Sequence, residues 1–265
     1  MTDAAIPRDA ATVILIRDGG REKMEVFLMR RHRDQAFMGG AFVFPGGSLD
    51  KHDADPELAS YIVGPNAQEA GRHLGEPEIP ASTALGLYMA AIRETFEEAG
   101  ILLAYDDQEE LLQFKDQQTE DKYSAARSGI YEKTMTLKDL ARQEKIRFAC
   151  DLLMPFAHWI TPDFEKKRFN TRFFLARVPD GQIALHDSVE MTESLWMSPA
   201  EALAAYRERK IMLMPPTLKN LEDLAPFSSG EALFQAAAKR RIDIVLPQGR
   251  KFDGVHALLL PHDPE

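Results

Sequence analysis

Residues 82–99 have the length and composition of one strong helix, and short strand-like segments stand on both sides of it. Ser82 or Thr83 is predicted as its N-cap and Gly100 as its C-terminal stop. The strands are predicted at 11–16, 24–30, 41–44, 152–160, 172–178 and 189–197. Further helices are predicted at 199–209, 216–225 and 230–240. This order predicts a mixed α/β layer fold rather than a helical bundle or a barrel.

The 265 residues contain no clean linker, so we predict a single domain, 1–265, with insertions. One insertion is 54–80, a loop broken by turn residues that holds at most one short helix. The other is 105–147, a polar stretch that is helical in pieces and opens with a run of acids typical of a solvated face. The last helices form a C-terminal extension.

The formal net charge of −10 argues against a protein that works mainly by binding nucleic acid. Cys150 is the only cysteine, so no intrachain disulfide and no cysteine-based zinc cluster is possible, and we expect a buried thiol. No apolar run is long enough for a membrane helix, and the N-terminus lacks the pattern of a secretory signal. We therefore expect a cytoplasmic protein that can form a homodimer.

The segment Arg93-Glu94-Thr95-Phe96-Glu97-Glu98-Ala99-Gly100 places three glutamates on one helix face. Each helical residue turns by about 100°, so these carboxylates share a narrow arc while apolar neighbours pack on the other side. Held together in a cleft, they raise one another's pKa and need a cation nearby. Arg93 can balance one charge, and a hard divalent ion such as Mg²⁺ or Mn²⁺ can balance the others.

An amphipathic surface helix is the alternative for three glutamates alone. Two features favour the metal interpretation. Gly100 ends the helix beside the acids, and the pair Gly46-Gly47 follows a strand and a proline upstream. Glycines at such a place let backbone carbonyls approach an ion closely.

The sequence resembles the Nudix family on these residues. Arg93-Glu94-x-x-Glu97-Glu98-x-Gly100 matches the second half of the Nudix box, G-x5-E-x7-R-E-U-x-E-E-x-G-U, and Gly47 matches its first glycine. Asp53 stands where the family has Glu, and residues 54–92 interrupt the box. The resemblance implies a Nudix-type α/β/α sandwich with a mixed sheet and helical insertions.

The interruption resembles a subgroup of coenzyme A diphosphatases that carry an insertion inside the box. Further similarity lies in the segments 30–33, 44–50, 158–162, 168–174 and 191–196. The subgroup implies hydrolysis of coenzyme A or acyl-CoA to 3′,5′-ADP and 4′-phosphopantetheine. Alternatives are an ADP-ribose, dinucleotide or damaged-nucleotide diphosphatase, a non-catalytic nucleotide-sensing module, and an isomerase on the same scaffold.

The resemblance also implies roles for named residues. Glu94, Glu97 and Glu98 bind Mg²⁺ or Mn²⁺, with the carbonyl of Gly46 as a further ligand, and Arg93 orients the glutamates. The base that takes a proton from water is Glu94 or a loop acid, Glu190 or Glu193.

Basic residues are expected to bind the remaining phosphates of a small-molecule diphosphate substrate. For each of them, ordinary surface charge is the alternative. His158 and Trp159 lie in an apolar strand and are interpreted as core or pocket wall. The candidates for substrate binding are Arg31 and Arg33, with Arg30 beside them, and Arg168 and Arg172, with Lys166 and Lys167.

Overall fold

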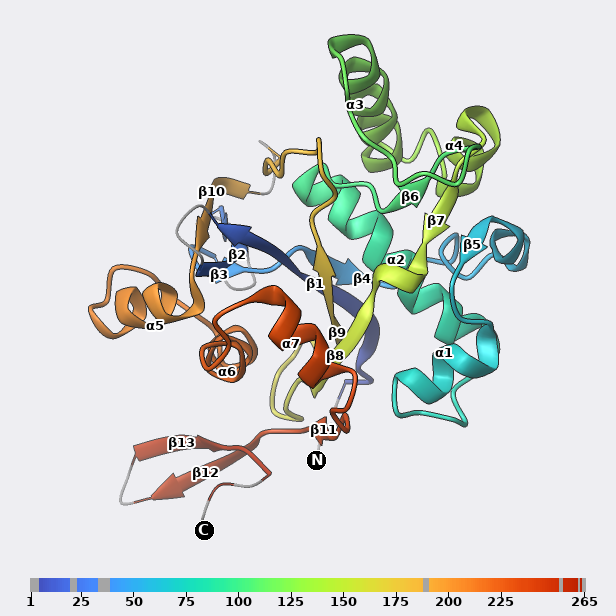
Figure 1. The fold of residues 1–265 in the computed structure, drawn as a ribbon. Helices are drawn as coiled ribbons and strands as arrows, with labels where there is room; N and C mark the ends of the chain where they lie inside the picture. The colour runs from blue at the N-terminus through green and yellow to red at the C-terminus, as the bar shows by residue number, and fades with distance from the viewer. Residues whose placement is uncertain are drawn as a thin grey trace.

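The chain folds around a mixed sheet with the strand order β10-β2-β1-β9-β8-β11, to which β3 adds on β2 and β4 on β1 (Figure 1). This computed structural model describes residues 5–19, 23–32, 39–187, 191–252, 255–261 and 263. The strands of the sheet are β1 (Arg8–Gly19), β2 (Lys23–Arg31), β3 (Phe42–Val43), β4 (Gly46–Ser48), β8 (Met154–Ile160), β9 (Phe169–Arg177), β10 (Met191–Met197) and β11 (Ile244–Val245).

The sheet is mixed because β1 runs parallel to β9 and β8 runs parallel to β11, whereas the other pairs are antiparallel. Each of the six predicted strands has a counterpart, although β1 extends well beyond 11–16 and β9 begins before residue 172. The short strand predicted at 41–44 is divided into β3 and the turn that leads to β4.

Alternation along β1 gives the sheet two apolar faces. Val13 and Leu15 pack in one core cluster with α2 (Ala81–Ala99). Ile14 and Ile16 pack in a second cluster on the opposite face. The helices of that second layer are α5 (Pro199–Arg207), α6 (Pro215–Leu224) and α7 (Gly230–Ala237). These layers confirm the predicted α/β/α arrangement.

Helix α2 begins one residue earlier than predicted, and its N-cap is Pro80 rather than Ser82 or Thr83. No side chain caps this end; the Pro80 carbonyl accepts the first helical bond from Ala84 at 2.9 Å. The predicted stop is confirmed. Gly100 has φ 71°, in the left-handed region, and its N–H donates to the Phe96 carbonyl at 3.0 Å.

The two predicted insertions contain more structure than expected, and they meet each other. The first holds a 3₁₀ helix (Pro56–Tyr61), β5 (Ile62–Val63) and α1 (Ala67–His73). The second holds β6 (Ala104–Tyr105), α3 (Gln117–Tyr131), α4 (Leu137–Glu144) and β7 (Arg147–Ala149), followed by a 3₁₀ turn (Cys150–Leu152). Strands β5, β7 and β6 form a small sheet of their own, so the two insertions are hydrogen-bonded to each other.

The C-terminal extension is only partly helical. After α7 the chain adds β11 to the main sheet and continues into a hairpin of β12 (Gln248–Phe252) and β13 (Val255–Leu259). Within the described ranges, no helix has the length and apolar character that crossing a bilayer requires. The single-domain organisation, the cytoplasmic location and the homodimer stay predictions.

Gly100→Ala should lower the free energy of unfolding by about 1–2 kcal/mol, because alanine pays a steric penalty at positive φ. A Cβ there would also come within 3.0 Å of Arg127 Nη1. Urea unfolding followed by circular dichroism measures the change. Gly129→Ala is the matched control, since Gly129 lies inside α3 without a positive φ. Equal stability of the Gly100 variant and the wild type would contradict this assignment.

Candidate active site

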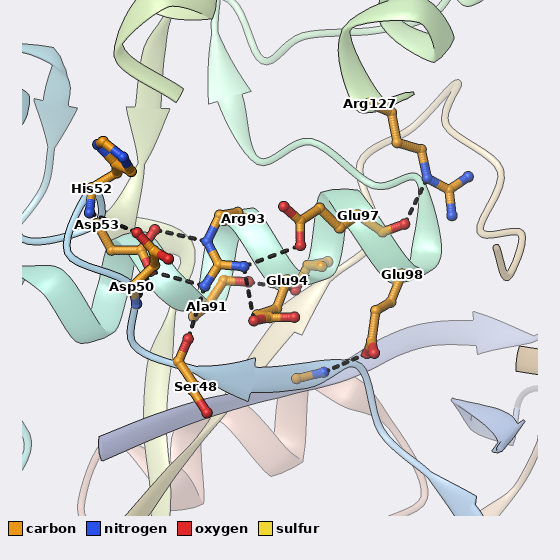
Figure 2. Close-up of polar contacts among 12 residues, drawn as sticks. Ser48, Asp50, His52, Asp53, Ala91, Arg93, Glu94, Glu97, Glu98 and Arg127 are labelled. Carbon is orange, nitrogen blue, oxygen red and sulfur yellow. Dashed lines mark hydrogen bonds and ion pairs between the residues drawn. The ribbon is translucent and has the colours of Figure 1, made fainter. Parts of the chain in front are cut away.

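The Arg93 side chain is the centre of a charged cluster on one face of α2 (Figure 2). Its Nε and Nη2 donate to the two oxygens of Asp53 at 2.8 and 2.9 Å. Its Nη1 donates to Glu94 Oε1 at 2.8 Å and to Glu97 Oε2 at 3.0 Å. Nη2 also donates to the Ser48 carbonyl at 2.9 Å. The guanidinium therefore contacts three carboxylates, where the sequence predicted that it balances one.

Asp53 anchors this arginine. The residue is 3% exposed, and its Oδ2 also accepts the backbone N–H of Asp50 at 2.8 Å. Burial disfavours the Arg93 charge, yet the bonds to Asp53 and the nearby glutamates raise the pKa of Arg93 above its ordinary value. Asp53 is absent from the predicted site residues, although its box spacing from Gly47 was the signal that could have identified it.

Glu94 is buried against the backbone of Gly47. A Cβ on Gly47 would collide with the Glu94 carboxylate, so a larger residue here would push that carboxylate out of its position. Burial raises the pKa of Glu94 to about 7, and Glu97 adds to the shift while Arg93 opposes it. Burial also raises the pKa of Glu97, again against Arg93. The predicted repulsion between glutamates therefore acts on Glu94, but loss of solvent is the larger cause.

Glu98 joins α2 to the sheet. Its Oε2 accepts the backbone N–H of Gly46 in β4 at 2.7 Å. A Cβ on Gly46 would lie 2.6 Å from the Ala11 carbonyl oxygen, which explains a glycine at this strand position. The predicted metal-ligand role of the Gly46 carbonyl stays a prediction.

The glutamates of α2 share one helix face, as predicted. However, the described part of the chain holds no group of three or more His, Cys, Asp or Glu side chains arranged as a ready-made metal site. Arg93 draws Glu94 and Glu97 to itself, whereas Glu98 turns to Gly46 (Figure 2). What fits a hard cation is the chemistry of the donor set, namely carboxylate oxygens held partly out of water.

The C-terminal carbonyls of α2 are bound by later parts of the chain. Arg127 Nε from α3 donates to the Glu97 carbonyl at 2.8 Å (Figure 2). The backbone N–H of Leu185 donates to the Ala99 carbonyl at 2.9 Å, and the backbone N–H of Asp187 donates to the Glu98 carbonyl at 3.0 Å. These bonds satisfy carbonyls that a helix end leaves open, and they fix the turn that carries Glu97 and Glu98.

A cavity of about 1010 Å³ opens over the cluster. This volume is at the upper end of the usual range for small-molecule sites. Its charged end is lined by Gly46, Gly47, Asp50, His52, Asp53, Arg93, Glu94, Glu97, Glu98 and Asp187.

The predicted substrate-binding arginines are not gathered at this cavity. Arg31 lines it, and Arg33 lies outside the described residues. Arg168 is not part of the lining; its Nε donates to the Thr161 carbonyl at 3.0 Å and its Nη1 to the Ala5 carbonyl at 2.8 Å.

Arg172 is buried in a separate polar network on the α2 face of the sheet. It is 3% exposed and donates to both oxygens of Glu76, at 2.8 and 2.7 Å, and to Asp9. His158 lies in the same network, with Nε2 at 2.6 Å from Asn170 Oδ1. Burial lowers the pKa of His158, which favours the neutral ring. The placement of Arg172 therefore does not support substrate binding.

Glu193, the predicted alternative base, lies on β10 outside the cavity lining, with Oε2 at 3.3 Å from Arg30 Nη1. Glu190 lies outside the described residues. Trp159 is buried and lines the cavity, as predicted for a pocket wall. Cys150 is a fully buried free thiol, also as predicted, and burial raises its pKa.

Two lysines line the cavity. Lys133, in the turn between α3 and α4, has φ 59°. The backbone hydrogen bond from His52 is the main cause that lowers the pKa of Asp50, and burial is the main cause that raises the pKa of Glu97; the Lys133 charge makes a smaller, lowering contribution at both, so it is near the acids. Lys167, part of the predicted basic cluster, has its Nζ 5.3 Å from the centre of the Phe169 ring. Lys133 was missed because no pattern distinguishes it within the polar run 105–147.

The fold and this charged helix define a Nudix-type domain, and comparison with known proteins agrees. A family model described as the NUDT19 Nudix domain matches residues 7–224. The chain belongs to this family. A crystal structure of a NUDIX hydrolase from Alicyclobacillus acidocaldarius has the same fold, with a TM-score of 0.69 and 24% identity over 87% of this chain and 96% of that chain.

Curated relatives include proteins named acyl-coenzyme A diphosphatase NUDT19. The one from Xenopus laevis is 27% identical over 245 residues, which cover 83% of this chain and 64% of that protein. The one from Homo sapiens is 26% identical over 258 residues, which cover 84% of this chain and 66% of that protein. The alignments thus span just under two thirds of the length of these two relatives.

Asp53→Asn should lower the free energy of unfolding by about 3 kcal/mol, because it leaves the Arg93 charge partly buried without its bidentate partner. Thermal and urea unfolding measure the change. Asp121→Asn is the matched control, since Asp121 is exposed on α3 and accepts one bond, from Gln117. If both variants lost the same small amount of stability, the anchoring role of Asp53 would be wrong.

Proposed function

We propose that this chain is a divalent-metal-dependent diphosphohydrolase that cleaves the diphosphate of coenzyme A or acyl-CoA. The products are 3′,5′-ADP and 4′-phosphopantetheine or its acylated form. The observation that carries the proposal is the buried set of carboxylates around Arg93, facing a large cavity in a NUDT19-type Nudix domain. The names of the curated relatives support this choice of substrate.

Glu94, Glu97 and Glu98 are the proposed ligands for Mg²⁺ or Mn²⁺, with the Gly46 carbonyl as a further oxygen. All four residues line the same cavity. Crowded, partly desolvated carboxylates are stabilised when a hard cation neutralises them. When bound, the ion would screen the substrate diphosphate and lower the pKa of a water molecule. Arg93 keeps Glu94 and Glu97 oriented, and Asp53 keeps Arg93 in place.

Glu94 is the proposed general base, because it is the one candidate base placed at the described cluster. Its carboxyl, which lines the cavity, takes the proton of the attacking water. The water oxygen bonds to one phosphorus, the bridging P–O bond breaks, and its electrons remain on the departing phosphate.

Substrate phosphates are proposed to bind cations that line the cavity, namely Lys133 and Arg31. Lys133 is the sharper candidate because its charge acts on Asp50 and Glu97. A lysine is a compact point charge that binds phosphate without a fixed geometry.

Two other classes of function remain as outcomes of the test. A diphosphatase for ADP-ribose, dinucleotides or damaged nucleotides would use the same carboxylates with a different pocket. A nucleotide-sensing module without catalysis is disfavoured because Glu94, Glu97 and Glu98 are all retained.

A substrate panel decides among these functions. The protein is incubated with Mg²⁺ or Mn²⁺ and with coenzyme A, acyl-CoAs, ADP-ribose, NADH, dinucleotide polyphosphates or oxidised dNTPs, and mass spectrometry identifies the products. We expect 3′,5′-ADP from coenzyme A and acyl-CoAs, and loss of turnover in EDTA. Ligand binding without any cleavage would support the sensing module.

Glu97→Gln and Glu98→Gln should each lower kcat/KM by about 100-fold or more, because an amide is a much weaker ligand for a hard cation. The fold should survive, since an amide oxygen can still accept the bonds from Arg93 and Gly46. Glu57→Gln, at an exposed position beside Lys138, is the matched control. Wild-type turnover and wild-type metal affinity by calorimetry in both site variants would refute the metal assignment.

Lys133→Met should raise the KM for coenzyme A about tenfold with little change in kcat, because it removes a charge that contacts substrate phosphate. Steady-state kinetics measure the split between KM and kcat. Lys115→Met, at an exposed site outside the cavity lining, is the control. An unchanged KM in the Lys133 variant would exclude this residue from the phosphate site.

A further inference from the structure

The end of the cavity away from α2 is apolar. It is formed by the end of β8, by one face of β9 and by the start of α6. The side chains that form this apolar wall are Trp159, Ile160, Phe169, Phe173, Met214 and Pro215.

Strand alternation explains why this wall is free of the charges on the same strands. Phe169, Thr171 and Phe173 of β9 line the cavity, whereas Arg172 between them points into the buried network with Glu76. On β8, Trp159 pairs with Thr171 and lines the cavity, whereas His158 pairs with Arg172. The two faces of the sheet thus separate a polar network from an apolar wall.

The register of the sheet gives the backbone spacing between β4, which contacts the acids, and the strands that carry the apolar wall. Gly46, which binds Glu98, pairs with Thr12, and Thr12 pairs with Phe173. Two strand spacings separate Gly46 from Phe173, about 10 Å. In the next row, Ser48, Ala10, Thr171 and Trp159 follow one another across the sheet. Trp159 therefore lies three spacings from β4, about 14 Å.

Most of the cavity's charged groups are gathered at one end. The acid cluster and Lys133 lie at the end bounded by α2 and the α3–α4 turn, where Ile130 and Met135 also line the cavity; the apolar wall lies at the other end, with Glu165 and Lys167 in the loop beside it. A ligand that fills such a space carries a multiply charged group joined to an apolar arm. The strands that carry the wall lie about 10–14 Å from β4, so the polar connection must span at least that distance.

We infer that the apolar wall is a subsite for the acyl chain of an acyl-CoA, an inference that rests on the proposed function. The pantetheine arm is about as long as four extended peptide residues, roughly 14 Å. With the diphosphate at the acids, the thioester reaches Trp159 and Phe173, and the acyl chain continues along Ile160, Met214 and Pro215. A nucleobase stacked on Trp159, Phe169 and Phe173 is the competing occupant, and it would make activity independent of acyl-chain length.

The subsite predicts that catalytic efficiency rises with acyl-chain length. Each buried methylene contributes about a fourfold gain, so octanoyl-CoA should exceed acetyl-CoA by at least tenfold in kcat/KM. Ile160→Glu places a charge in the path of the chain and should reduce this octanoyl-to-acetyl ratio at least tenfold. Ile183→Glu is the matched control, because Ile183 is 73% exposed and outside the cavity lining.

Phe164→Glu gives a second test that does not depend on tolerance of a charge in β8. Phe164 lines the cavity from the loop between β8 and β9 and is 57% exposed, so the variant should fold. We expect its octanoyl-to-acetyl ratio to fall as well. A ratio near one in the wild type, or wild-type ratios in both variants, overturns the acyl subsite. Equal losses on both substrates would leave the ratio unchanged and overturn it too.

A binding measurement separates failure of the subsite from failure of the proposed function. Trp159 lies in the wall, so in a Trp196→Phe background its fluorescence reports occupancy during titration with octanoyl-CoA and acetyl-CoA in EDTA, without turnover. Tighter binding of octanoyl-CoA that Ile160→Glu abolishes supports the subsite, even if the panel detects no hydrolysis. Equal dissociation constants for the two ligands overturn the subsite, whatever the enzyme cleaves.

Discussion

The bidentate pair between Arg93 and Asp53 is the interaction on which the site depends. It joins the turn after β4 to α2, which are separated in sequence by residues 54–92. Through the same guanidinium, the pair sets the orientation of Glu94 and Glu97. Removing one member of this cluster of one arginine and three carboxylates destabilises the fold, because it leaves a partly buried charge without a partner and without enough water to solvate it. The geometry of the acids therefore depends on residues that do no chemistry.

The interruption of the box is fastened to the rest of the fold at several points. Strand β5 within it pairs with β7 of the second insertion. Lys138 of α4 reaches Asp55 at 2.6 Å, and Glu76 receives Arg172 of β9. These contacts hold both insertions beside α2, so that Lys133 lines the same cavity as the acids. The insertions therefore contribute to the wall of the cavity and are not peripheral surface segments.

Local patterns predicted the layers and the acid helix well. Periodicity and Gly100 marked α2, and alternation marked β1, β2 and β9, because these signals come from neighbours in the chain. The substrate-binding residues depend on long-range packing instead. In the sequence, nothing distinguishes Arg172 or Lys133 from an ordinary surface cation. Only the fold shows that Arg172 is paired with Glu76, whereas Lys133 is near the acids of the cavity.

The signals for the start of α2 and for the last strand of the sheet were also weaker guides than tertiary context. Pro80 starts α2 without a side-chain cap, although Ser82 and Thr83 follow it. Strand β11 is too short to show a pattern and exists because β8 offers a free edge for parallel pairing.

Chain entropy explains why so long an interruption is tolerated. Closing a loop grows more costly only with the logarithm of its length, so extending the connection from seven residues to the whole of 54–92 costs about 1.5 kcal/mol. The salt link at its base offsets a penalty of that size, which leaves the length of this segment open to change while its two ends stay fixed.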